Sequence, residues 1–335
     1  MSYIAVIKEA VHTVHKNWQL VVIQFAAMLL SCISFFAIVG IPIAVAFVMF
    51  GLDFTEILRF TDVISAFKGS AEFLGKYFGM ALVVILSLII YIAFIVLLWI
   101  FTVSGAIGIL SKSMMDEGHR FTVKSFFAEG RRLFFPVLLF SSLVSIIFVT
   151  LAFILGILGG TASAVIEMAK TQEVTLALFL GVFFSLVLIS AGLFLIMVTL
   201  SITVYGIAFT AFDGLKPFNA LKETVKYLYS TPSSIAFYVI LLIGYTLAGF
   251  IVVLIGTPLT LIPIIGPILS LPYQIVTYAV QGYVSLIMLS SVFHFYYKTR
   301  QVSPPLQSSL DSDASPNIEG GQPPLPVETD PTRQE

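Results

Sequence analysis

The sequence predicts an all-α membrane protein, with six transmembrane helices that form three repeated helical hairpins with interfacial amphipathic helices. Its residues are 59% hydrophobic and 10% charged, a balance typical of membrane proteins. Five segments contain no Asp, Glu, Lys or Arg, and each exceeds the ~20 residues that a helix needs to cross ~30 Å of hydrocarbon. These segments do not alternate between apolar and polar residues, as the strands of a membrane β-barrel do.

The uncharged segments place the spans. They run over 17–52, 77–111, 133–166, 174–212 and 227–297. The last segment must hold two spans, because Pro258, Pro263, Pro267 and Pro272 recur too closely for one continuous helix. We therefore expect spans near 18–39, 79–101, 135–157, 177–203, 234–255 and 273–296. The link from Gly256 to Pro272 carries no charge, so it is either a re-entrant segment or an apolar link at the outer interface.

The distribution of basic residues predicts the orientation. Of the lysines and arginines that flank the spans, twelve fall on the side of the two termini and four on the opposite side. Because basic residues are enriched in cytoplasmic loops, both termini are expected in the cytoplasm, in a multi-pass protein of the cell inner (plasma) membrane. The net charge of −1 gives no reason to expect nucleic acid as a partner.

A pattern recurs before the first, third and fifth spans. An amphipathic segment with a lysine at the same place precedes each of them, and the lysines are Lys8, Lys124 and Lys222. The outer ends of the three spans that follow keep nearly the same spacing, at Gly40, Gly159 and Gly256. We interpret residues 1–299 as one membrane domain of three units, about 1–110, 111–212 and 213–299.

The amphipathic segments are expected to lie in the headgroup layer with their lysines toward phosphate. In the first unit the apolar stripe is Ile4, Ile7, Val11, Val14 and Trp18. Gly118 and Gly214 supply helix stops before the second and third of these segments. On the opposite side, Asp53 to Lys76 mixes apolar and charged residues and could also rest on the bilayer.

Residues 300–335 form a different region. From Gln301 to Glu335 there are seven prolines, six acidic residues, one arginine and no aromatic residue. Such a segment cannot bury a core, so we expect a disordered, Pro/Ser-rich acidic cytoplasmic tail that could dock a protein partner.

The stretch Asp213-Gly214…Pro217…Ala220-Leu221-Lys222, which enters a span after a short amphipathic helix, resembles a broad group of bacterial multi-pass proteins. They are similar to the membrane domain fused to some glycerophosphodiester phosphodiesterases. The resemblance covers roughly 1–298 and implies a six-helix membrane domain of unassigned activity. The sequence shows no soluble catalytic domain like that of the fused enzymes, so no catalytic residue carries over.

The predicted spans contain no Asp, Glu, Lys or Arg, which argues against a proton-coupled carrier, a metalloprotease or a charge-lined pore. We expect no catalytic residue, no cofactor and no metal site. His12 and His15 share a helix face, and His294 lies near a span end, but none has a visible ligand partner in the sequence. Cys32 is the single cysteine, so no disulfide can form within the chain.

Two sets of polar residues could carry function. Within the spans they are Gln24, Gln274, Gln281, Tyr91, Tyr205 and Tyr245, which either line a path for an uncharged or amphipathic solute or bond between helices. A cavity lined by Gln274, Gln281 and Tyr245 would favour a path. On the cytoplasmic side, possible lipid-headgroup contacts are Lys8, Lys124, Arg131, Arg132 and Lys222, unless these only fix topology.

Three functions are compatible with these patterns. The first is a non-enzymatic protein that organises membrane lipids or partner proteins at the inner face. The second is a transporter or exporter of lipid-like or neutral molecules, favoured by the repeated hairpins and the broken helix after the fifth span. The third is a membrane subunit for a separately encoded enzyme, which the family resemblance suggests.

Overall fold

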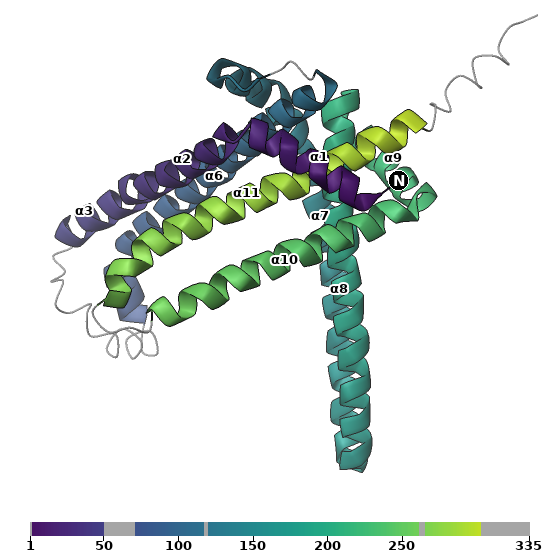
Figure 1. Ribbon diagram of the computed structural model, residues 1–335. Coiled ribbons are helices and arrows are strands. Elements are labelled where there is room, and N and C mark those ends of the chain that lie inside the picture. The colour runs from purple at the N-terminus through teal and green to yellow at the C-terminus, as the bar shows by residue number, and fades with distance from the viewer. Residues whose placement is uncertain (1, 50–70, 117–119, 261–264, 303–335) are drawn as a thin grey trace, which may run out of the picture. The chain divides into compact units, whose positions relative to one another are not determined.

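A computed structural model describes residues 2–49, 71–116, 120–260 and 265–302 of the chain (Figure 1). Within these ranges the secondary structure is helical, with short connections. The chain divides into two compact units at Tyr296 and Tyr297, and the first unit contains almost all of the helices. The tail predicted over 300–335 falls outside the described residues, except that the last helix continues to Val302.

The first span is longer than the sequence suggested. Helix α1 (Tyr3–Lys16) is followed by α2 (Gln19–Phe35), which continues through a π-helical turn, η1 (Phe36–Gly40), into α3 (Ile41–Met49). Pro42 has no backbone N–H to donate to the preceding turn, and a π turn is one way for a helix to accommodate such a residue. The expected end near residue 39 is therefore wrong, because the helix passes through the proline.

The longest helices are α6 (Ala71–Met115), which ends the first unit of the predicted repeat, and α7 (Val123–Gln172) and α8 (Val174–Asp213), which form the second. Helix α7 begins after Thr122, whose side-chain oxygen accepts a hydrogen bond from the backbone N–H of Ser125 at 3.1 Å. The amphipathic segment expected before the third span is not a separate helix. It forms the first turns of α7, which runs through Pro136 without a break.

The remaining helices are α9 (Pro217–Ser230), α10 (Pro232–Thr260) and α11 (Ile265–Val302). Gly214 ends α8 with φ at 63°, a left-handed conformation that glycine adopts without strain, which confirms this predicted helix stop. The stop expected at Gly118 and most of the segment 53–76 lie outside the described residues. Helices α10 and α11 reach further into the proline-rich link than expected, and the Tyr273 hydroxyl donates to the carbonyl of Val252 beside Gly256.

Six helical stretches in the described ranges are long and apolar enough to cross a membrane, which confirms the all-α, multi-pass fold. They are Gln19–Ala46, Ala81–Met115, Val123–Gln172, Val174–Asp213, Pro232–Pro258 and Pro272–Arg300.

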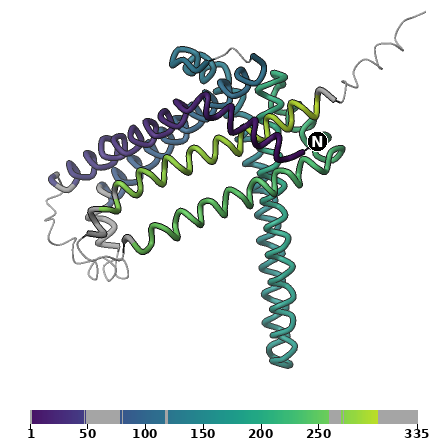
Figure 2. Tube along the Cα trace, in the orientation of Figure 1, coloured from purple at the N-terminus to yellow at the C-terminus, as the bar shows by residue number. Residues whose placement is uncertain are grey.

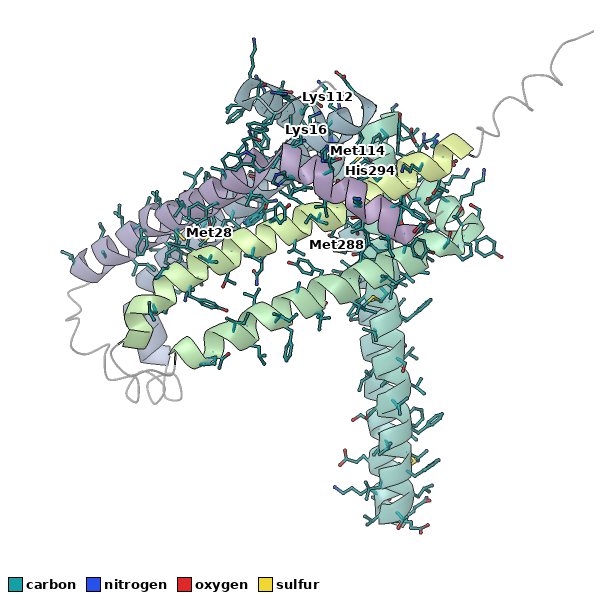
Figure 3. All side chains as sticks on the ribbon, in the orientation of Figure 1. Lys16, Met28, Lys112, Met114, Met288 and His294 are labelled. Atoms are coloured by element: carbon teal, nitrogen blue, oxygen red, sulfur yellow. The ribbon has the colours of Figure 1, made fainter. Side chains whose placement is uncertain are left out.

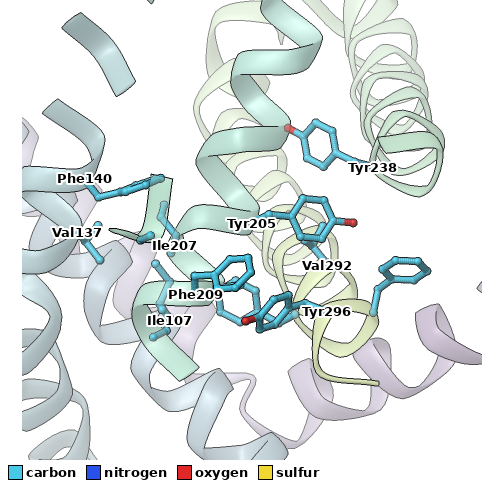
Figure 4. Packing of buried hydrophobic residues seen from close by; sticks show 14 of the residues in the cluster. Ile107, Val137, Phe140, Tyr205, Ile207, Phe209, Tyr238, Val292 and Tyr296 are labelled. Atoms are coloured by element: carbon cyan, nitrogen blue, oxygen red, sulfur yellow. The ribbon is translucent and has the colours of Figure 1, made fainter. Parts of the chain in front are cut away.

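The main hydrophobic core lies where α1, α9, the first turns of α7 and α10 and the last turns of α6, α8 and α11 meet (Figure 4). We call this the packed end. Its largest fully buried side chains include Tyr205 and Tyr296. The Tyr205 hydroxyl donates to the carbonyl of Ser234 at 2.9 Å, and the Tyr296 hydroxyl donates to the Asp213 carboxylate at 2.7 Å. These bonds satisfy the polar atoms of two aromatic residues in the core.

Away from the packed end, α7 and α8 pack mainly on each other and run side by side (Figure 2). The structure buries no residue in 145–161 of α7 or in 181–200 of α8. Their exposed side chains there are mostly Phe, Ile, Leu and Val, as lipid-facing surfaces require. A Cβ added to Gly156 or Gly160 would meet no atom within 4 Å, whereas Gly108 packs directly against Glu129.

Candidate functional site

A pocket lies between α2, α6, α10 and α11, with a volume of about 290 Å³. We call it the four-helix pocket. Its lining is Val21, Gln24, Phe25, Trp99, Tyr245, Tyr278, Ala279, Gln281, Gly282 and Ser285. It includes Gln24, Gln281 and Tyr245 from the polar residues singled out in the sequence. The expected Gln274 is not among the lining residues and is exposed elsewhere on α11.

The polar groups of the four-helix pocket lie inside the span region of the helices. Gln24 is five residues into α2, roughly 8 Å along its axis, and Gln281 precedes His294 on α11 by roughly 20 Å. Gly282 permits this arrangement, because a Cβ there would lie 2.7 Å from Oε1 of Gln24. The two amides can donate and accept hydrogen bonds, and the described lining contains no Asp, Glu, Lys or Arg. This chemistry suits an uncharged polar group.

The rim of the four-helix pocket is aromatic. Trp99 is 40% exposed and Tyr278 is 47% exposed, whereas Gln24, Gln281 and Gly282 are half-buried. Side chains at this level of a transmembrane helix face lipid. The pocket therefore combines polar groups in its interior with an apolar, lipid-level entrance.

A second pocket, of about 640 Å³, lies at the packed end and has charged residues in its lining. We call it the α1 pocket, and its lining is Ala5, Lys8, Glu9, His12, Thr13, Lys16, Ser113, Met114 and His294. Figure 3 shows Lys16, Met114 and His294 near the crossing of α1 and α11. This pocket is polar and basic, unlike the four-helix pocket.

Contacts between α1, α6 and α11 build the α1 pocket. Nε2 of His294 and Oγ1 of Thr13 share a hydrogen bond of 2.9 Å, and Nδ1 of His294 lies 3.7 Å from a Glu9 oxygen. The latter distance is too long for a hydrogen bond, so Glu9 acts on His294 through its charge. Asn17 donates to the carbonyl of Thr13 at 2.9 Å and to Oγ of Ser113 at 3.2 Å, which fixes α1 against α6. His294 thus has partners on α1 that the sequence did not reveal.

A layer of buried apolar side chains adjoins the linings of both pockets. The layer consists of Val14, Leu20, Ala106, Ile109, Leu110, Phe126 and Leu286, all buried. Val14 follows Thr13 of the α1 pocket, while Leu20 and Leu286 adjoin Val21 and Ser285 of the four-helix pocket. We call it the apolar layer.

The structure does not bring the five predicted headgroup contacts into one site. Lys8 lines the α1 pocket, whereas Lys124, Arg131 and Lys222 are exposed on α7 and α9. Arg132 pairs with Glu129 at 2.7 Å. Their distribution follows from the separate helices that carry them.

Glu129 is a buried charged residue that the sequence analysis missed. Its side chain is 4% exposed and pairs with Lys112 of α6 at 2.6 Å as well as with Arg132. The spacing of Glu129 and Arg132, three apart on one helix, was the available signal. Lys112 comes from the preceding helix, so the complete network could not be read from local sequence.

The other singled-out polar residues serve helix contacts. Ser31 and Tyr91 share a hydrogen bond of 3.4 Å between α2 and α6, and Tyr205 bonds Ser234 as described. His12 lines the α1 pocket and His15 does not. Among the described residues, no group of three or more His, Cys, Asp or Glu could hold a metal ion.

Fold and pockets together define a polytopic α-helical membrane protein with a polar pocket in its span region. Comparisons of the chain with protein family models, curated proteins and solved structures gave no match. The resemblance to the membrane domain of glycerophosphodiester phosphodiesterases therefore stays a prediction. The two pockets are the features of the described chain that point to a function.

Proposed function

We propose that this protein binds lipid-like or neutral molecules in the four-helix pocket and transports them through the membrane domain. The observation that carries the proposal is the lining of this pocket, in which Gln24, Gln281 and Tyr245 converge without a charged neighbour among the described lining residues. Polar residues that serve helix packing alone need no such space. An uncharged polar ligand would replace the hydrogen bonds that these groups cannot obtain from lipid.

The size of the pocket indicates how such a molecule binds. Its volume of about 290 Å³ is at the lower end of the ~300–1,000 Å³ of small-molecule sites. It fits a polar head or a small solute rather than a complete lipid. The tail of an amphipathic molecule would remain in the bilayer beside Trp99 and Tyr278 at the rim. Entry is then lateral, from lipid.

Movement out of the pocket requires a conformational step. The apolar layer adjoins the linings of both pockets, and transport from one pocket to the other needs its side chains to separate. Leu20 and Leu286 of this layer belong to two different helices, α2 and α11. A shift of α11 against α2 would open the route, as in transporters in which one bundle moves against another.

Transbilayer movement of a fluorescent amphiphile with an uncharged head, in liposomes that contain the purified protein, tests the proposal. Gln281→Leu removes one hydrogen-bonding group and should slow movement about five- to tenfold. Gln274→Leu is the matched control, because Gln274 lies on the same helix, is exposed and does not line the pocket. Movement no faster than in empty liposomes, or equal effects of the two substitutions, would refute transport through this pocket.

The orientation belongs to the proposal. We place the packed end at the cytoplasmic face, because twelve of the basic residues that flank the spans belong to that side. The beginning of α1 and the end of the first compact unit at Tyr296 both lie at the packed end, as an even number of spans requires. The α1 pocket then faces the cytoplasm.

A second candidate function is the organisation of lipid at the cytoplasmic face. Lys8, Lys124 and Lys222 are all exposed, and the residue three positions after each, Val11, Phe127 or Val225, is exposed too. The residues two positions after the lysines, Ala10, Phe126 and Thr224, are buried in all three helices. This common register supports the threefold repeat and gives each unit a basic and apolar outer surface suited to headgroups. A subunit role beside a separate enzyme rests on the resemblance alone.

A further inference from the structure

The α1 pocket has the composition of an anion site. Lys8 and Lys16 contribute two ammonium groups, and His12 and Ser113 add further hydrogen-bond donors. Ser113 accepts a hydrogen bond from Asn17, so its own hydroxyl hydrogen can be donated elsewhere. Several donors around a space of about 640 Å³ suit a ligand that carries several acceptor oxygens.

The lining of the α1 pocket contains one carboxylate, that of Glu9. Glu9 lies beside Nδ1 of His294, and Nε2 of the same ring bonds Thr13. The imidazole, only 13% exposed, stands between the carboxylate and the hydroxyl. Glu9 therefore has a neighbour on α11, and the lining as a whole carries two lysines and one glutamate.

The outer surface of α1 shows at which level of the membrane the pocket lies. Ile4 is 77% exposed, Trp18 is 56% exposed, and Val11 is exposed between them. The opposite side of α1, with Val6, Ala10, Thr13 and Val14, is buried against the bundle. The expected apolar stripe therefore divides, because Val14 faces the protein. A helix with exposed Ile and Trp beside lysines lies at the headgroup level.

We propose that the α1 pocket binds a phosphate group, with Lys8 and Lys16 as its charged ligands and His12 and Ser113 as additional donors. A phosphate of an anionic lipid occurs at this level, and basic pockets between transmembrane helices bind such headgroups. A free phosphate or a soluble phosphate ester would present the same chemistry from the aqueous side. The proposal stands whether or not the four-helix pocket transports anything.

Calorimetric titration of the detergent-purified full chain tests the proposal with four probes. They are short-chain phosphatidic acid, short-chain phosphatidylcholine, glycerol phosphate and inorganic phosphate. We expect phosphatidic acid to bind at least about tenfold more tightly than phosphatidylcholine, whose choline cation the lysines repel. Tighter binding of the lipid than of the two soluble phosphates assigns the source as lipid, and comparable binding assigns it as a soluble phosphate. Absence of binding by all anionic probes overturns the proposal.

Substitutions of Lys8 and Lys16 test whether the phosphate probes bind in the α1 pocket. Lys8→Ala with Lys16→Ala should weaken phosphatidic acid binding about tenfold or more, whereas Lys8→Arg with Lys16→Arg should retain most of it. Lys222→Ala is the matched control, because Lys222 is an exposed lysine of α9 outside the pocket. The arginine pair also shows that the positions tolerate substitution in the folded protein. If Lys222→Ala weakens binding as much as the Lys8 and Lys16 pair does, the affinity reflects general surface charge and the pocket assignment is wrong.

Discussion

Glu129 illustrates, at the scale of single residues, how this protein tolerates a charge inside its packed end. Removing a carboxylate from water costs several kcal/mol, and close cations must offset that cost. Lys112 at 2.6 Å and Arg132 at 2.7 Å provide them, and their side chains are 37% and 51% exposed. The cations therefore reach water while Glu129 does not. Loss of Glu129 would leave two groups that can still be hydrated.

We predict that Glu129→Gln lowers the free energy of unfolding by about 1–3 kcal/mol, because the ion pairs with Lys112 and Arg132 are lost. Glu167→Gln is the control on the same helix, where the glutamate is exposed, and its effect should stay within about 0.5 kcal/mol. Unfolding of both variants by a denaturing detergent, followed by circular dichroism, measures the difference. Equal stabilities would show that the buried network contributes nothing.

Sequence reasoning identified individual polar residues better than their partners. Gln24, Gln281 and Tyr245 stood out because amides and hydroxyls are rare in apolar spans, but their convergence depends on how α2, α10 and α11 pack. His294 likewise meets Thr13, 281 positions away in the chain. No local pattern encodes such a pair.

At the scale of helices, the close approach of α7 and α8 at the packed end depends on one glycine, Gly206. A Cβ on Gly206 would overlap the ring of Phe140, which is fully buried. Gly181, further along the same helix α8, has no neighbour within 4 Å of the corresponding position. A substitution of Gly206 therefore tests tight packing, and a substitution of Gly181 tests helix propensity without a packing effect.

We predict that Gly206→Ala destabilises the protein by about 1–3 kcal/mol, because the Phe140 ring must leave its place in the core. Gly181→Ala should instead be neutral or stabilise by up to about 1 kcal/mol, since alanine favours helix and meets no neighbour there. Thermal unfolding in detergent measures both. Phe140→Leu in the Gly206→Ala protein should restore part of the loss, and a Gly206→Ala variant as stable as the Gly181→Ala variant would contradict the packing shown in Figure 4.

The number of spans could be predicted from the charge-free segments, but not all of their ends could. Prolines at 258 and 272 suggested an interruption, yet both lie within helices in the structure, as do the prolines at 42 and 136. In a bilayer, a helix that loses one hydrogen bond at a proline is still cheaper than an exposed irregular backbone. The rule that prolines end helices, taken from water-soluble proteins, therefore placed the ends of the first and fifth spans, near 39 and 255, too early.

For the whole molecule, the main consequence of the fold is that both ends of the six-helix unit meet at the packed end. Whichever way the protein is oriented, α1, α9 and the α1 pocket therefore face the same compartment. We expect the exposed lysines at this end to set the orientation during insertion.

Cysteine labelling tests the predicted orientation. It uses a Cys32→Ser background, which removes the only natural thiol. Lys170→Cys, at the far end of α7, should react with a membrane-impermeant maleimide in intact cells. Lys226→Cys, on α9, should react only after the membrane is permeabilised, because we propose that the basic end faces the cytoplasm. The reverse pattern would overturn the assignment of the packed end, and labelling of the Cys32→Ser parent would invalidate the assay.

The hairpin of α7 and α8 also sets a demand on bilayer thickness. Helix α8 has 40 residues and is roughly 60 Å long, while the hydrocarbon core measures ~30 Å and a tilt of ~40° extends the path to only ~39 Å. Its charge-free stretch, 174–212, exceeds that path. Lipids around the hairpin must therefore stretch, or its tip must emerge into the headgroups. Either response costs fractions of a kcal/mol per Å of mismatch, which favours residence in the thickest patches of membrane available.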